Sequence, residues 1–192
     1  MKSVFRAFVA FDLSDEVLVQ IDQVLAGLQA RMAGLPIRWV PTQNIHLTLK
    51  FLGDVSVSNV ERLAEILRSA VAGFSVFELS IGGLGVFPNE RRPSVLWLGV
   101  EGPSALQSIQ HRVDVEVARL GYRADERSFA PHLTIGRVAR NAGHAEIRQV
   151  AEAVQAERVG FLGAAVVREI HLYKSELRPS GAVYAKVYSA PL

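Results

Sequence analysis

Two stretches carry the pattern that decides the fold, IHLTLKFL at residues 45–52 and FAPHLTIGRV at residues 129–138. Each contains a histidine, a leucine, a threonine and an aliphatic residue in that order. Side chains two positions apart on a strand point to the same face, so each histidine should stand beside its threonine. The leucine between them should point the other way, into a core. Both stretches are therefore predicted to be strands with one polar and one apolar face.

Chance does not explain the repetition of this pattern. The chain has five histidines and three threonines among its 192 residues. On that composition, roughly 0.08 histidines are expected to have a threonine two positions later. Two of them do, and they use two of the three threonines. Each half of the chain thus holds one such strand, which predicts two lobes related by an internal near-repeat.

Strict alternation assigns the other side chains of these strands to faces. In the first strand the expected core face holds Leu47, Leu49 and Phe51, and the opposite face holds His46, Thr48 and Lys50. Lys50 should then add positive charge beside the histidine. In the second strand Arg137 is out of phase with His132. It should lie at the surface unless a bulge turns it inward, where a guanidinium fork would suit an anionic oxygen.

The rest of the chain mixes strand and helix signals. Helices are predicted at 17–32, 58–71, 104–120 and 145–154, and strands at 4–13, 77–87, 95–100, 164–177 and 183–188. Hairpins and helical crossovers occur together, which is typical of an α+β fold and not of a doubly wound parallel sheet. No stretch has the composition of a flexible linker, so residues 1–192 are expected to form one domain.

Composition excludes several classes of protein. The chain has no cysteine, which excludes zinc ribbons, thiol nucleophiles and disulfide scaffolds. Its net charge of +2 is far from that of a general nucleic-acid binder. It also lacks an apolar run long enough for a signal peptide or a transmembrane helix. We therefore expect a cytoplasmic protein that makes no membrane contact.

Two imidazoles and two hydroxyls around one cleft would suit displacement at phosphorus. Imidazole titrates near neutral pH, so one copy can accept a proton while the other donates one. Threonine hydroxyls can hold phosphoryl oxygens without acting as nucleophiles. Other chemistries fit less well. Neither histidine has a carboxylate in strand phase beside it for a metal, and the chain has no G-x-S-x-G elbow. The glycine-rich stretch at 82–85 lacks a following Lys-Ser/Thr, so it indicates a bulge or a close backbone approach and not a phosphate loop.

The two motifs and their flanks resemble the 2H phosphoesterases. Within that superfamily the chain is similar to the bacterial and archaeal RNA 2′,3′-cyclic phosphodiesterases, historically described as 2′-5′ RNA ligases. The similarity runs through RAFVA at 6–10, WVP at 39–41, HLTLKFLG at 46–53, GVFP at 85–88, LWLGV at 96–100, FAPHLTIGR at 129–137, LYKSEL at 172–177 and GAVY at 181–184.

This resemblance implies a fold and an activity. The implied fold is a bilobal α+β structure, with two pseudo-symmetric lobes whose antiparallel sheets face a central cleft and whose helices lie outside. The implied reaction opens a 2′,3′-cyclic phosphate, on an RNA end or a nucleotide, to a 2′-phosphate without a metal or cofactor, and reversible 2′-5′ RNA ligation could use the same site. By carry-over His46 is the proton donor, His132 is the proton acceptor, and Thr48 and Thr134 hold phosphoryl oxygens. We expect a monomer.

Substrate contacts are less well defined by the sequence. The candidates are Arg137, Lys50, Phe51, Phe8 and Arg92. The two phenylalanines could stack on a base or belong to the core, and Arg92 lies in a proline-flanked loop that is either solvated or a rim for RNA phosphates. Two other functions stay open: a 2H activity on another small cyclic nucleotide, and a binding module without turnover.

Overall fold

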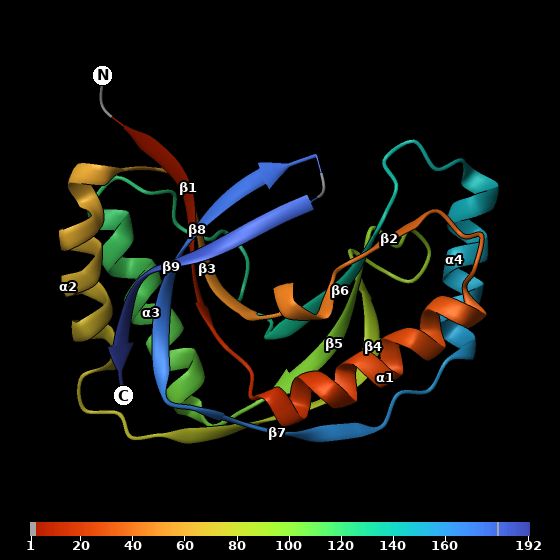
Figure 1. Ribbon diagram of the computed structural model, residues 1–192, viewed down its shortest axis with the longest axis horizontal. Helices are drawn as coiled ribbons and strands as arrows, with labels where there is room; N and C mark the ends of the chain where they lie inside the picture. The colour runs from red at the N-terminus through yellow and green to blue at the C-terminus, as the bar shows by residue number, and fades with distance from the viewer. Residues whose placement is uncertain (1–2, 180) are drawn as a thin grey trace.

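One antiparallel sheet runs through the described part of the chain, residues 3–179 and 181–192 of a computed structural model (Figure 1). Eight of its nine strands follow the order β7-β4-β5-β6-β3-β1-β8-β9, and the ninth, β2, pairs with β6. The strands are β1 (Val4–Phe11), β2 (Ile37–Trp39), β3 (Leu47–Ser56), β4 (Phe77–Phe87), β5 (Val95–Glu101), β6 (His132–Val138), β7 (Phe161–Val167), β8 (Glu169–Arg178) and β9 (Gly181–Pro191). The helices are α1 (Asp15–Arg31), α2 (Val60–Val71), α3 (Ser104–Arg119) and α4 (His144–Ala156).

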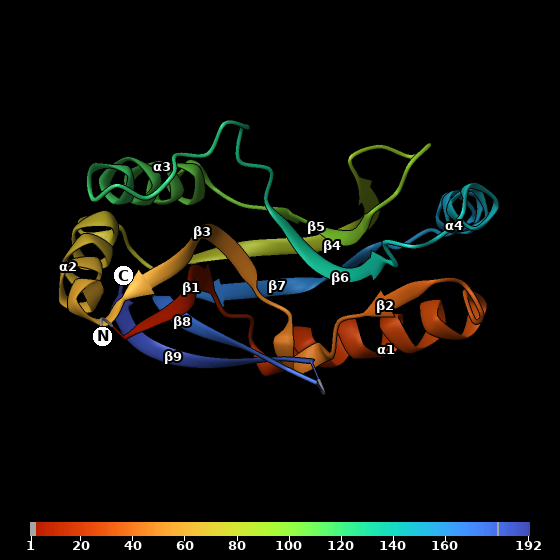
Figure 2. The ribbon, with the colours of Figure 1, turned by 90° about the horizontal axis from the view of Figure 1, so that it is seen from above.

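The strand order is symmetric about the contact between β3 and β6. On one side β3, β1, β8 and β9 form a lobe that packs against α2 and α3, and on the other β6, β5, β4 and β7 form a lobe with α1. The figures place α2 and α3 at one end of the molecule and α1 and α4 at the other (Figures 1 and 2). The expected α+β fold with two related lobes and outer helices is confirmed. Among the described residues, no helix is long and apolar enough to cross a membrane.

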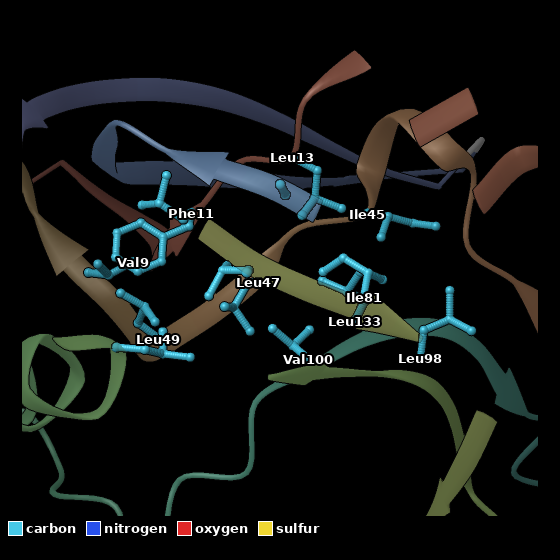
Figure 3. Packing of buried hydrophobic residues seen from close by; sticks show 14 of the residues in the cluster. Val9, Phe11, Leu13, Ile45, Leu47, Leu49, Ile81, Leu98, Val100 and Leu133 are labelled. Carbon is cyan, nitrogen blue, oxygen red and sulfur yellow. The ribbon is translucent and has the colours of Figure 1, made fainter. Parts of the chain in front are cut away.

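A single residue pair joins β3 to β6, namely Leu47 with Leu133. Both leucines are fully buried and belong to the core, where they lie among residues of β1, β4 and β5 (Figure 3). Burying a leucine side chain stabilises a fold by about 1.5–3 kcal/mol. The prediction that the leucine between each histidine and threonine points into a core is therefore confirmed at both motifs.

Each motif has a β-bulge at the same position, the aliphatic residue after the threonine. Leu49 is the extra residue on β3, since Thr48 pairs with Ala10 and Lys50 with Val9. Ile135 is the extra residue on β6, since Thr134 pairs with Trp97 and Gly136 with Leu96. A bulge puts two residues of one strand opposite one residue of its partner, so the faces exchange beyond it.

These bulges overturn the phase predicted from strict alternation. Phe51 was expected on the core face with Leu47, but it is 65% exposed. Lys50 was expected beside His46 as a free charge, but it is 1% exposed and lies inside the protein. Arg137 is turned to the same side as His132, which is the second of the two roles left open for it.

Three further differences from the predicted elements have physical causes. The strand predicted at 45–52 continues to Ser56, because Gly53 adopts a φ of +70° beside a further bulge. The strand predicted at 164–177 is two strands, β7 on β4 and β8 on β1, separated at Arg168. The short β2 was not predicted, because three residues give little periodic signal.

The glycine-rich stretch behaves as predicted. The β4–β5 register shifts between Gly82 and Leu84, and Gly83 has a φ of +73°. A side chain at Gly85 would place its Cβ 2.2 Å from the Trp97 ring, so glycine is required for this close approach.

The Leu47–Leu133 contact can be tested by truncation. Leu133→Ala should lower the free energy of unfolding by about 2–5 kcal/mol and shift the NMR signals of both motif histidines. Leu67→Ala on α2 is the matched control, because Leu67 is equally buried. This substitution should lower the free energy of unfolding by a similar amount and leave the histidine signals unchanged. Unchanged histidine signals in Leu133→Ala would contradict the proposed dependence.

Candidate active site

The two histidine–threonine pairs meet on one face of the sheet. In an antiparallel pair the residues flanking a matched position also face each other. The match of Leu47 with Leu133 therefore places His46 opposite Thr134 and Thr48 opposite His132. Because the two leucines point into the core, all four polar side chains point to the other face. The arrangement has approximate two-fold symmetry, with one imidazole and one hydroxyl from each strand.

Each imidazole is held by the same kind of hydrogen bond. Nδ1 of His46 lies 2.8 Å from the carbonyl oxygen of Asn44, and Nδ1 of His132 lies 2.7 Å from that of Ala130. A carbonyl oxygen can only accept, so both Nδ1 atoms carry the hydrogen. Nε2 of each ring is then the atom that can gain or lose a proton.

Aromatic rings surround His46. Its ring is stacked on Phe8 with centroids 4.6 Å apart, and Tyr184 meets it edge-on at 5.3 Å. Tyr173 packs against both rings, with its centroid 5.2 Å from that of Phe8 and 6.2 Å from that of His46. Phe8 is only 3% exposed, so it supports the imidazole and has no open face for a base. Of the two roles left open for Phe8, its burial fits the second, that of a core residue.

Burial shifts the titration of His46. Its pKa is lowered from the usual 6.5, chiefly because burial disfavours the charged ring. The hydrogen bond to Asn44 and the negative charge of Asp12 act in the opposite direction and raise the pKa. Asp12 is itself held by the Tyr173 hydroxyl, which donates to it, and by Lys186, whose Nζ lies 2.6 Å from a carboxylate oxygen.

The surroundings of His132 are different. Phe87 meets its ring edge-on at 4.9 Å, and the Trp97 ring centroid lies 6.5 Å away. His132, Thr134 and Thr48 line a pocket of about 610 Å³, a volume suited to a small organic ligand. His46 is not part of this lining.

The pocket takes one further residue from each bulged strand. Phe51 and Arg137 both line it, and each lies five positions after the histidine of its motif. The bulges at Leu49 and Ile135 turn these two side chains toward the pocket. Two sequence candidates thus reach the site at equivalent positions of the two repeats.

Two other candidates, Lys50 and Arg92, do not supply a free positive charge to the pocket. Lys50 borders it, but its Nζ is 2.5 Å from Asp114 and 2.8 Å from Asp125, so its charge is neutralised by carboxylates. Arg92 is exposed in the loop between β4 and β5 and is not in the lining, and its backbone N–H donates to Asn89. The suggested rim for RNA phosphates is therefore not part of this pocket.

Several residues near the site were missed from the sequence. Tyr173 and Tyr184 come from β8 and β9, far along the chain from either motif, and the wall of the pocket at residues 123–130 has no regular structure. The only sequence signal was the LYKSEL and GAVY flanks of the resemblance. Neither contains a pattern that predicts contact with His46.

Comparison with known proteins agrees with this architecture. Residues 11–97 and 98–184 each match the LigT-like phosphoesterase family, which accounts for the two lobes as a repeat. The chain belongs to this family, within the 2H phosphoesterases, and is therefore an enzyme that acts on phosphodiesters.

Individual relatives cover nearly the whole chain. The RNA 2′,3′-cyclic phosphodiesterase of Methanothermobacter thermautotrophicus is 36% identical over 93% of this chain and 94% of its own. That of Thermotoga maritima is 34% identical over 95% and 93%. Among solved structures, E. coli LigT complexed with 3′-AMP superposes with a TM-score of 0.79 at 26% identity, covering 99% of both chains.

The titration of His46 gives a direct test of its environment. An NMR titration should show a His46 pKa below 6.5 in the free protein, because burial disfavours imidazolium. Asp12→Asn should lower it further, since the carboxylate stabilises the charged ring. His111→Ala, which removes an exposed histidine of α3, is the control and should leave the His46 curve unchanged. A His46 pKa at or above 6.5 would contradict this account.

Proposed function

We propose that this enzyme hydrolyses a terminal 2′,3′-cyclic phosphate of RNA to a 2′-phosphate, by metal-independent acid–base catalysis with His46 and His132. The observation that carries the proposal is the pairing of Leu47 with Leu133, which sets two histidine–threonine pairs face to face. The curated relatives named RNA 2′,3′-cyclic phosphodiesterase support the substrate class.

The proposed step is an in-line displacement at phosphorus. Nε2 of His132 takes a proton from water, and the water oxygen forms a bond to phosphorus. The bond between phosphorus and the 3′ oxygen breaks, and Nε2–H of His46 gives its proton to that oxygen. The products are a 2′-phosphate and a free 3′-hydroxyl. Thr48 and Thr134 donate hydrogen bonds to the non-bridging oxygens as charge builds up on them.

The low pKa of His46 fits an acid whose charge depends on substrate. A ring that holds its proton weakly gives it up readily to a leaving oxygen. The anionic cyclic phosphate, once bound nearby, favours the imidazolium form and so restores the proton that catalysis needs. The tautomer set by Asn44 directs that proton to Nε2.

Phe51 and Arg137 are proposed to hold the terminal nucleotide. Phe51 presents an exposed ring to the pocket, and such rings stack on unpaired bases. Arg137 also lines the pocket, where its guanidinium can bond an anionic oxygen or stack on the base.

Removing either histidine should abolish most turnover. General acid and base groups each contribute about 10²–10⁴-fold, so His46→Ala and His132→Ala should lower kcat on a 2′,3′-cyclic nucleotide by that factor. His111→Ala should keep wild-type activity, and EDTA should have no effect on any variant. Near-wild-type turnover by either motif variant, or a 3′-phosphate product, would contradict the mechanism. Formation of a 2′-5′ linked product from two RNA pieces by the wild-type protein, and its loss in the two motif variants, would extend the proposal to ligation.

The acid and base roles can be separated with a modified leaving group. In a cyclic substrate with sulfur in place of the 3′ oxygen, the leaving group departs as a thiolate and needs little protonation. This substrate should restore much of the rate to His46→Ala and none to His132→Ala. Recovery in His132→Ala instead would show that the roles are exchanged. Steady-state kinetics on the oxygen and sulfur substrates measures both outcomes.

A further inference from the structure

One continuous segment forms a wall of the pocket. Residues 123–130, which join α3 to β6, all line it and lead directly into His132. This wall has no regular secondary structure of its own. Its position must therefore come from contacts with neighbouring elements.

Lys50 ties this wall to the first motif strand. Its buried Nζ lies 2.5 Å from Asp114 Oδ1 on α3 and 2.8 Å from Asp125 Oδ1 in the wall. The backbone N–H of Asp125 also donates to Asp114, at 3.2 Å. A buried ammonium is tolerated only when it is paired, so the lysine holds both carboxylates close to β3. Lys50 lies two positions after Thr48. The wall is thereby fixed relative to the face of the sheet that carries the motif histidines and threonines.

The charges of the pocket are not all paired. Its carboxylates are occupied, Asp125 by Lys50 and Glu126 by Arg123. Within residues 3–179 and 181–192, Arg127 and Arg137 are the lining cations with no salt-bridge partner. Arg137 belongs to β6, and Arg127 belongs to the wall that Lys50 holds. The pocket therefore offers two separate positive charges.

We infer that Arg127 binds the phosphodiester that precedes the terminal nucleotide, so that the pocket selects RNA ends over free cyclic nucleotides. The inference rests on the proposed function. A cyclic mononucleotide carries one phosphate, whereas an RNA end carries the cyclic phosphate and the next phosphodiester along the chain. Two unpaired arginines in one pocket match the second substrate, and arginine is well suited to phosphate oxygens. Lys50, Asp114 and Asp125 are positioning residues that act through the wall.

The test compares a dinucleotide that ends in a 2′,3′-cyclic phosphate with the matching cyclic mononucleotide. Arg127→Ala should lower kcat/KM for the dinucleotide about tenfold more than for the mononucleotide, as expected for a lost charge-assisted contact. It should also reduce the salt dependence of KM for the dinucleotide, by about 0.7 in the log–log slope for one phosphate contact. Arg148→Ala, which removes an exposed arginine of α4 outside the pocket, is the control and should change neither value.

Equal losses on the two substrates, or no loss on either, would overturn the inference. Failure of the proposed function is distinguishable from this, because the wild-type protein would then turn over neither substrate. An unchanged salt slope in Arg127→Ala would also count against a phosphate contact.

The role of the wall has its own test. Asp114→Asn keeps the shape of the side chain and weakens the tie to Lys50. It should raise KM for the dinucleotide while changing kcat little, because the motif residues keep their own contacts. Combined with Arg127→Ala it should add little further loss, since both changes remove the same phosphate contact. Additive effects of the two substitutions, or a loss in kcat alone, would show that Asp114 does not act through Arg127.

Discussion

The pairing of Leu47 with Leu133 is the contact on which the site depends. It is the only matched pair between β3 and β6 in the described residues, yet it joins the two lobes into one sheet. Both leucines are driven into the core by burial of apolar surface. A slip of one residue in either strand would turn the histidine and threonine inward and the leucine outward. The hydrophobic effect at two leucines therefore sets the position of four polar groups.

The bulges at Leu49 and Ile135 change which side chains of the two motif strands reach the pocket. An unbroken strand would place Phe51 in the core and leave Arg137 on the far face. One extra residue in each strand brings both to the pocket and sends Lys50 inward, where it meets Asp114 and Asp125. The two equivalent bulges thus bring an aromatic ring from one lobe and a cation from the other to the pocket.

The sequence predicted the parts that depend on local pattern. The His–Thr strands, the buried leucines and the α+β class follow from alternation and from the order of elements. The bulges at Leu49 and Ile135 do not, because an extra residue is defined only against a partner strand. The two roles of Phe8 also stayed open, because its packing against His46 and Tyr173 depends on residues from distant parts of the chain. The break at Arg168 was missed because strand-forming residues stand on both sides of Arg168 and Glu169, and only the pairing of β7 and β8 with strands in different lobes separates the two strands.

Two equivalent motifs can divide an acid–base reaction only if their surroundings differ, since groups with the same environment favour the same protonation state. The difference here comes from residues outside the motifs. Phe8, Tyr173 and Tyr184 enclose His46 and favour its neutral form, against the charge of Asp12. His132 instead lines the pocket that Arg127 and Arg137 also line, and neither arginine has a salt bridge within residues 3–179 and 181–192. The repeat explains how the four groups meet, and residues outside the motifs give the two histidines different surroundings.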